Sequence, residues 1–387
     1  MKKFKMSVVI STLLLTSNCM ADNSESLQSQ IDGLKKEIAS LQDNSDSIES
    51  ELAKKDDTSV KMNGYMDAYY GIYSGDKNNG ANDGFRIYRF SLIPNQQINK
   101  NLRWLAEIEF EDAPRRQPGN ELTITGNNVE GLYGQIFLER SYMQYDLNPM
   151  LKIRLGRDFC HSTVWSDNHY PTFILPEARP LSERKIFPHV NDGIEILGNT
   201  LLGSIPFDYI AYYGNGNKYD GGSDVNSEDI VGARVRVQLP VGSFNRISFS
   251  GSTGGMTGAD TAVTTPKNEQ TNIGVSLEQK FAQFDLKAQY SQATVNNGNN
   301  KYDLTGYYAN LSYTYEDFTP WAQYDIYNDK NTNTEDQRIT LGLQYSVSSN
   351  LKLKIEHQLD TQKDTLTNAD VAAKKGNATL LAAAIYF

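Results

Sequence analysis

The feature that most limits how this chain can fold is a repeat of two residues that starts near residue 59. In "VGARVRVQLP" (231–240), Val231 and Val235 would lie on one face of a strand and Arg234 on the other. Similar alternation appears in "FDLKAQYS" (284–291), "YYANLSYTY" (307–315) and "LKLKIEHQL" (351–359). This periodicity predicts β-strands with one apolar and one polar face. A soluble β-sandwich would show it too, so alternation alone leaves the kind of sheet open.

The spacing of these segments is more specific. The sixteen expected strands are 59–73, 85–94, 101–111, 134–147, 149–158, 191–198, 205–213, 227–239, 243–253, 270–282, 283–294, 303–315, 317–328, 336–348, 350–360 and 376–387. Short connections such as "NPM", "PVGS" and "YED" alternate with long or polar ones such as 112–133, 159–190 and 254–269. An even number of antiparallel strands, with short turns at one rim and long loops at the other, is typical of outer-membrane β-barrels. The predicted fold class is therefore an all-β transmembrane barrel.

Both ends of the chain agree with this prediction. Residues 1–21, "MKKFKMSVVISTLLLTSNCMA", have lysines, then an apolar run, then a small residue, so we expect a secretory signal peptide cleaved before Asp22. Cys19 leaves a lipoprotein signal as an alternative. The last segment, "TLLAAAIYF", alternates and ends on Phe387, which resembles the signal for insertion of barrels into the outer membrane. Aromatic residues near strand ends, among them Tyr88, Trp104, Phe281, Phe284 and Phe318, would form the two interfacial girdles.

Residues 22–58 have a different period. Leu27, Ile31, Leu34, Ile38 and Leu41 follow one another in alternating steps of four and three, which predicts a short coiled coil. A single amphipathic helix packed on the barrel is the alternative. Because both ends of an even-stranded barrel lie at the short-turn rim, we expect this segment in the periplasm. The predicted domains are a signal peptide (1–21), a periplasmic coiled-coil segment (22–58) and the barrel (59–387).

Composition narrows the classes of function. The mean hydropathy of −0.53 is too low for a helical membrane protein but suits a barrel, where every second strand residue meets lipid. The 47 acidic residues outnumber 37 basic ones, which argues against a nucleic-acid partner. Beyond the leader only Cys160 remains, so no intrachain disulfide can form. No metal-ligand spacing and no phosphate-binding glycine loop is present, and we expect neither metal nor cofactor.

The third long connection, residues 159–190, breaks the alternation. It holds four of the twelve prolines and apolar runs such as "PTFILP", which need a surface to pack on. A sixteen-strand barrel is wide enough to enclose an aqueous channel. We therefore expect this loop to fold inward and narrow the channel, because a long segment without strand pattern in a compact domain usually has a function.

The same region resembles a known family. "QIFLERSYMQYDLNPMLKIRLGRDF" followed by "NHYPTFILPEARPLSERKIFPHVNDGIEILGN" is similar to the phosphate-selective porin O/P superfamily, and "GFRIYRFSLIPNQQINKNLRWLAEIEFE" resembles its earlier hairpin. The resemblance implies a trimeric outer-membrane porin. Some relatives, the dicarboxylate-specific DcaP-like porins, also carry an N-terminal periplasmic coiled coil, as do some sugar porins. Phosphate-specific members have walls rich in lysine and arginine, whereas the wall expected here is nearly balanced.

Charged residues of the loop and wall are the candidates for selecting solutes. In the constriction loop they are His161, His169, Arg179, Glu183, Arg184, Lys185 and His189. On the pore wall the strand phase places Arg89, Arg103, Lys152, Arg154, Arg234, Arg236 and Arg246 inward. Inward acidic residues are expected at Glu107, Glu109, Asp158, Glu195, Glu278, Asp285, Asp325 and Glu356. Rings of like charge select ions; alternatively, these charges pair with one another and hold the loop to the wall.

The predicted function is an outer-membrane porin for passive diffusion of small hydrophilic solutes, favouring anions such as phosphate or dicarboxylates. A general or sugar-type porin, or a barrel that anchors a periplasmic tether, remain alternatives. Expected partners are copies of the same chain, outer-membrane lipid, and small anionic or neutral solutes. Enzyme activity is not expected, because His357 has no well-placed serine and the grouping of His161 with Ser162 and Asp158 is weak.

Overall fold

The computed structural model describes residues 59–75, 83–116, 123–125, 128–130, 132–167, 169–183, 185–215, 229–240, 244–255, 269–296, 300–364 and 374–387. The predicted signal peptide and coiled coil lie outside these residues, as does the loop candidate Arg184. Among the described residues, no helix is long and apolar enough to cross a membrane.

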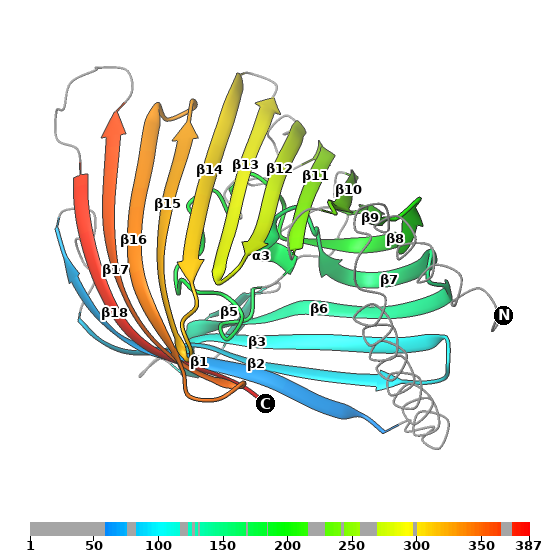
Figure 1. The fold of residues 1–387 in the computed structure, drawn as a ribbon, viewed down its shortest axis with the longest axis horizontal. Helices are drawn as coiled ribbons and strands as arrows, with labels where there is room; N and C mark the ends of the chain where they lie inside the picture. Colours follow the sequence, from blue (N-terminus) through cyan, green and yellow to red (C-terminus); the bar gives the residue numbers. More distant parts are fainter. Residues whose placement is uncertain are drawn as a thin grey trace, which may run out of the picture. The chain divides into compact units, whose positions relative to one another are not determined.

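Sixteen antiparallel strands form one closed barrel, in which each strand pairs with its neighbours along the chain (Figure 1). They are β1 (Lys61–Ser74), β2 (Gly84–Gln97), β3 (Leu102–Arg116), β6 (Leu132–Asn148), β7 (Leu151–Phe159), β8 (Val190–Leu202), β9 (Ile205–Gly214), β10 (Ile230–Gln238), β11 (Phe244–Gly255), β12 (Glu269–Phe281), β13 (Phe284–Asn296), β14 (Lys301–Tyr313), β15 (Phe318–Asp329), β16 (Thr334–Ser346), β17 (Leu351–Asp364) and β18 (Lys374–Tyr386). The predicted fold class and strand number are confirmed, and most strand ends fall within a few residues of the expected positions.

Two small elements were not expected. A hairpin of β4 (Thr123–Thr125) and β5 (Asn128–Glu130) lies in the connection between β3 and β6, and a single helical turn, α3 (Val164–Asp167), lies in the connection between β7 and β8.

The barrel closes where β1 pairs with β18, in a register that sets Tyr65 opposite Tyr386. Phe387 extends this pairing, because its amide donates to the Gly64 carbonyl at 2.9 Å and its carbonyl accepts from the Gly64 amide at 2.8 Å. The Phe387 ring lies over Gly64 so closely that a Cβ there would be 2.6 Å from the ring. The seam therefore depends on a residue without a side chain at position 64.

Alternation along the strands separates lipid-facing from lumen-facing side chains. On β17, Leu353 and Ile355 are exposed on the outer face, whereas Lys354 and Glu356 point inward and are buried. Aromatic rings gather at the short-turn end, where Phe281 stacks on Phe284 at 5.2 Å and Phe318 packs on Tyr345 at 4.9 Å. These contacts suit an interfacial girdle.

Tyr88 differs from the expectation for a girdle residue. A β-bulge shifts the register of β1 and β2 between Asp67 and Ala68, and Tyr88 packs inside the barrel against Tyr69 and Leu380. The extra residue of the bulge reverses the strand phase beyond it, which the sequence pattern does not show.

Candidate functional site in the barrel lumen

The segment between β7 and β8 lies inside the barrel (Figure 1). The Val164 amide donates to the Gln289 side chain at 2.9 Å, and the Glu177 amide donates to the Glu356 carboxylate at 2.9 Å. The Gln270 side chain donates to the Ile186 carbonyl at 2.6 Å. Because Gln270, Gln289 and Glu356 are lumen-facing side chains of β12, β13 and β17, contact with all three places the segment against the inner wall.

Local sequence explains part of this path. Thr163 and Ser166 exchange hydrogen bonds, with the Thr163 hydroxyl accepting from the Ser166 amide at 2.9 Å, and so cap the single turn α3. Further along, Ile186 and Phe187 join a buried cluster with Ala293, Val295 and Leu304 of β13 and β14. This apolar contact fixes the second half of the loop to the wall.

Two lumen-facing glycines make room for the loop. A Cβ on Gly306 would lie 2.3 Å from the Ser182 Cβ, and one on Gly274 would lie 3.0 Å from the Phe187 ring. A larger residue at either position would push the loop away from the wall.

A first group of buried charges, the Glu177 latch, holds the middle of the loop. Arg89 Nε donates to Asp67 at 3.0 Å, and the Arg89 guanidinium lies 3.5 Å from Glu177. Lys354 Nζ lies 2.9 Å from Glu177 and donates to the Pro171 carbonyl at 2.7 Å. All four charged side chains are almost completely buried. Loss of one partner from such a group typically costs about 3–5 kcal/mol, because the other charges stay buried.

A second group, the Asp167 latch, holds the start of the loop. The Asp167 carboxylate accepts hydrogen bonds of 2.5 Å from Arg234 of β10, and Arg236 lies 2.5 Å from it. His161 Nδ1 is 3.0 Å from the same carboxylate, and Arg236 also donates to Asp208 at 2.7 Å. Burial alone would lower the pKa of His161, but the Asp158 and Asp167 carboxylates outweigh it and raise that pKa to about 9. At neutral pH the imidazole is therefore protonated and adds to the positive charge of this latch.

Below the Asp167 latch, toward the short turns, lies a pocket of about 390 Å³, here called the inner pocket. Its charged lining residues are Lys152, Arg154, His161, Asp167, Asp208, Arg234, Arg236 and Arg246. The β6–β7 register brings Gln144 opposite Arg154, and the Gln144 side-chain oxygen accepts from Arg154 at 2.8 Å and from Arg103 at 2.9 Å. Lys152 has no ion-pair partner among the described residues.

A second pocket, the outer pocket of about 700 Å³, lies near the long-loop ends of the strands. Tyr69, Tyr73, Tyr88 and Arg86 line it, together with the loop residue Glu177. Arg86 donates to the Tyr69 hydroxyl at 3.0 Å and to Asp112 at 2.5 Å. The loop thus stands between an aromatic pocket and a basic one.

The loop candidates are mostly engaged with the wall. Arg179 lies 3.4 Å from Glu111, and Lys185 lies 3.8 Å from Asp336 and over the Tyr327 ring. His189 Nε2 is 2.7 Å from Glu139, and Glu183 accepts from the Thr163 hydroxyl at 3.1 Å. His169 is buried against Phe159, with its Nε2 3.6 Å from Glu107, and burial is the largest influence that lowers the pKa of its imidazole. These contacts favour the alternative in which loop charges fix the loop in place.

Among the wall candidates, Arg89 and Arg154 are paired most closely with carboxylates. Arg89 is fully enclosed by the Glu177 latch, and Arg154 contacts Asp158 and lies 3.3 Å from Glu195. Arg246 donates to Glu278 at 2.5 Å. Sequence reasoning missed Arg140, which lies 2.5 Å from Glu107 inside the lumen and also bonds to Tyr170. A register shift opposite Glu107 and Ile108, with Glu139 as the extra residue, changes the strand phase between outward Leu138 and inward Arg140, and no feature of the sequence marks that shift.

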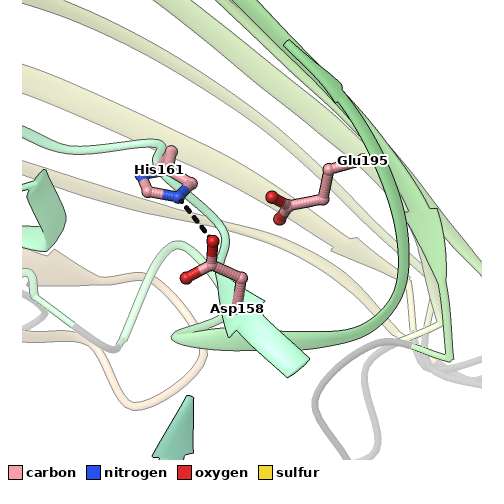
Figure 2. Close-up of side chains that lie close together, drawn as sticks. All are labelled: Asp158, His161 and Glu195. Carbon is pink, nitrogen blue, oxygen red and sulfur yellow. Dashed lines mark hydrogen bonds and ion pairs between the residues drawn. The ribbon is translucent and has the colours of Figure 1, made fainter. Parts of the chain in front are cut away.

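Asp158, His161 and Glu195 form a compact group of ionisable side chains (Figure 2), with potential ligand atoms all within 4.8 Å of one another. Arg154 Nη1 bonds to Asp158 and lies 3.3 Å from Glu195 and 3.4 Å from His161 Nε2. A guanidinium nitrogen thus already supplies the positive charge between the carboxylates. With a protonated His161, the arrangement is that of an ion-pair cluster.

Neither histidine considered for hydrolysis is hydrogen-bonded to a serine among the described residues. The Ser162 hydroxyl donates to the Cys160 carbonyl at 2.6 Å, although it follows His161 in sequence. On the outer face, His357 Nδ1 is 2.8 Å from the Thr379 hydroxyl.

Solved porins share this architecture at low sequence identity. An anion-selective porin from Comamonas acidovorans matches with a TM-score of 0.60 and 16% identity, over 85% of this chain and 99% of that one. The trimer form of OmpT from Vibrio cholerae matches with a TM-score of 0.55 and 14% identity, over 85% and 99%. The outer-membrane channel DcaP of Acinetobacter baumannii matches with a TM-score of 0.54 and 14% identity, over 85% and 97%.

Sequence comparison gives the family. An uncharacterized protein of Aquifex aeolicus is 26% identical over 252 residues, which is 61% of this chain but only 53% of that relative. The family model described as Gram-negative porin matches residues 39–365. The resemblance to outer-membrane porins seen in the sequence is therefore confirmed, and the chain belongs to the family of Gram-negative porins.

Proposed function

We propose that the barrel is a water-filled channel of the outer membrane, through which small hydrophilic solutes diffuse and small anions pass more readily than cations. The observation that carries the anion preference is the arrangement of charge in the inner pocket. The side chains of Lys152, Arg154, Arg234, Arg236 and Arg246 and the protonated imidazole of His161 line it, together with the carboxylates of Asp167 and Asp208.

Two of these cations, Arg154 and Arg246, pair with carboxylates that are less exposed than they are. The side chains of Asp158 and Glu195 are 2% and 3% exposed, whereas the Arg154 side chain that pairs with them is 11% exposed. Glu278 is 12% exposed and its partner Arg246 is 23% exposed. A solute in the pocket therefore meets the guanidinium of each pair more than its carboxylate. Guanidinium groups suit carboxylate or phosphate solutes, because they donate parallel hydrogen bonds to two oxygens.

A sugar-type or general porin is the second candidate, and the outer pocket favours it. Tyr69, Tyr73 and Tyr88 present aromatic rings and hydroxyl groups to the channel, and amphipathic aromatic side chains combine apolar contact with a hydrogen bond. The two candidate functions are compatible if neutral solutes bind in the outer pocket and the inner pocket discriminates between anions and cations.

The experiment that tests this function is conductance of purified protein in planar bilayers, with reversal potentials under a salt gradient. Discrete conductance steps with an anion/cation permeability ratio above one support the proposal. Conductance steps with a permeability ratio at or below one would instead support a general porin without anion selectivity. Absence of steps from protein that migrates as a folded barrel would favour the tether. Liposome swelling with phosphate, dicarboxylates and neutral sugars then identifies the solute class.

The assembly and the N-terminal region belong to the same proposal. We expect copies of the chain to associate as trimers, a form named for the similar OmpT barrel. Because β1 begins and β18 ends at the short-turn rim, residues 22–58 would enter the periplasm as a coiled coil, after removal of residues 1–21. N-terminal sequencing of the mature protein should begin at Asp22, and sedimentation in detergent should give the mass of three chains.

A further inference from the structure

The outer face of the barrel is apolar over the part of each strand nearest the short turns. On β15, the exposed side chains of this face are those of Phe318, Pro320, Ala322 and Tyr324. On β10 the outward residues are Val231, Ala233, Val235 and Val237. Such a band, about 25 Å tall, is the part of an outer-membrane barrel that faces hydrocarbon.

Two polar pairs that contain an arginine or a histidine lie within this band among the described residues. On β7 and β8, Arg157 Nε donates to Asp192 at 2.5 Å and Arg157 Nη2 donates to it at 2.6 Å, and both side chains remain about one third to one half exposed (34% and 44%). On β17 and β18, exposed His357 bonds to Thr379 at 2.8 Å. The register confirms that these are cross-strand neighbours, Arg157 opposite Asp192 and His357 opposite Thr379.

Both pairs lie at the same depth. Arg157 stands six residues after Leu151, the first residue of β7, and His357 stands six residues after Leu351, the first residue of β17. With a rise of about 3.3 Å per residue and a strand tilt of about 40°, each lies roughly 15 Å from the short-turn rim. Outward Leu359 lies beyond His357 on the same strand, so His357 is inside the apolar band.

Contact with lipid hydrocarbon is unfavourable for the polar groups of Arg157, Asp192 and His357. An arginine on the lipid face of a barrel costs about 2–4 kcal/mol near the bilayer midplane. Pairing with Asp192 reduces the charge, but the exposed edges of the carboxylate and guanidinium would still lack hydrogen-bond partners in lipid. A protein surface that supplies such partners would remove the cost.

A second copy of the chain has side chains that would supply such partners. Between the two pairs lie β1, β2, β3 and β6, whose exposed apolar side chains include Met66, Ile87 and Leu138. In a closed ring each copy uses two different surfaces, one for each neighbour. The imidazole of His357 uses Nδ1 for Thr379, which leaves Nε2 available to a neighbouring copy. Asp192 has oxygen lone pairs beyond its bonds to Arg157.

We propose that His357 of one copy contacts the Arg157–Asp192 pair of the next copy, and that this contact recurs around the oligomer. The proposal rests on the self-association included in the proposed function, but it is independent of the solute and of ion selectivity.

Disulfide trapping in outer membranes tests the contact. In a Cys160→Ser background, the double variant Asp192→Cys/His357→Cys should form disulfide-linked oligomers on mild oxidation, seen on non-reducing gels. Co-expression of the two single variants should give linked dimers only, and each single variant alone should give none. A matched control pairs Asp192→Cys with Tyr324→Cys, since Tyr324 is outward on β15 and stands six residues after Phe318; it should not cross-link.

Several results would overturn the proposal. If the double variant is folded by heat-modifiable migration and sediments as an oligomer but forms no disulfide, the copies meet elsewhere while self-association stands. If wild-type protein sediments as one chain, both self-association and the contact fail. If single variants link to themselves, the interface is two-fold, and if the Tyr324 control links equally well, the bonds arise from random collision. Bilayer conductance of the same samples tests the channel separately.

Discussion

Removing the carboxylate of Asp208 should increase anion selectivity without releasing the loop. Asp208 lines the inner pocket and accepts from Arg236 at 2.7 Å, and it belongs to β9. Asp208→Asn therefore adds one net positive charge to the pocket and leaves the Asp167 latch in place. A solute about 8 Å away feels roughly 0.5 kcal/mol per unit charge in water, and screening at 0.1 M salt reduces this to about 0.2 kcal/mol.

The Asp208→Asn substitution lowers the energy of an anion in the pocket and raises that of a cation. Anions gain and cations lose about 0.2 kcal/mol, which together give about a twofold rise in the permeability ratio, and a lower effective dielectric inside the channel raises this to about fivefold. The measurement is the reversal potential under a tenfold salt gradient, repeated at 1 M salt. At the higher ionic strength the effect should shrink, because the screening length falls to about 3 Å.

Two further variants separate charge from loop position. Asp167→Asn removes a carboxylate from the same pocket but also breaks the bonds of the loop to Arg234 and Arg236. If Asp167→Asn raises the ratio while single-channel conductance stays constant, charge alone explains both variants; a larger conductance shows that the loop has moved. Asp303→Asn, on the outer rim of β14, is the control outside the lumen. An unchanged ratio in folded Asp208→Asn would refute the reasoning that the inner pocket lies on the ion path.

Three other predictions follow from the latches and the seam. Lys354→Met should lower the free energy of unfolding of the barrel by about 3–5 kcal/mol and make single-channel current noisier, because Glu177 loses the nearer of its two cationic partners and the Pro171 carbonyl loses its donor. Lys352→Met is the control and should change neither, because Lys352 lies on the same face but bonds to Ser346 and Ser348 near the turn. The stabilisation from protonated His161, whose pKa is raised from its ordinary value of 6.5 to about 9, should be complete below pH 6.5 and lost as pH rises through about 9; melting of wild-type protein between pH 7 and 10 should show this loss, and His161→Gln should not. Gly64→Val should reduce the yield of folded barrel in outer membranes, since its side chain would clash with the Ser91 carbonyl and the Phe387 ring; normal yield would contradict the described seam.

The strands could be predicted because a barrel strand meets only two environments. Each lumen-facing residue follows a lipid-facing one, so the period of two in "LKLKIEHQL" assigns Leu353 outward and Lys354 inward, as observed. The rule fails where one residue is added. Bulges next to Asp67 and at Glu107 change the strand phase near Tyr88 and Arg140. Whether a bulge is stable depends on side chains of neighbouring strands, which the local sequence does not show.

The candidate site could be predicted only in part. Strand phase placed Arg154, Arg234 and Arg236 inside, but it could not identify their partners, because Asp167 lies in a segment whose path depends on the whole barrel. The same limit applies to Arg89, which the alternation assigned to the pore wall and which is enclosed by Asp67 and Glu177. Their roles in selectivity stay predictions.

The latches imply that rigidity and selectivity of the channel are linked. Asp167 holds the loop through Arg234 and Arg236, and those same guanidinium groups line the inner pocket, which the proposed function places on the path of a solute. An anion that binds there competes with Asp167 for the guanidinium groups. A stronger anion site would therefore weaken the latch, whereas a stronger latch would cover the cations. Lys152 is not subject to this competition between a bound anion and Asp167, because it lines the pocket and has no ion-pair partner among the described residues. Selectivity could change at Lys152 without loosening the loop, whereas changes at Arg234 or Arg236 would alter both properties together.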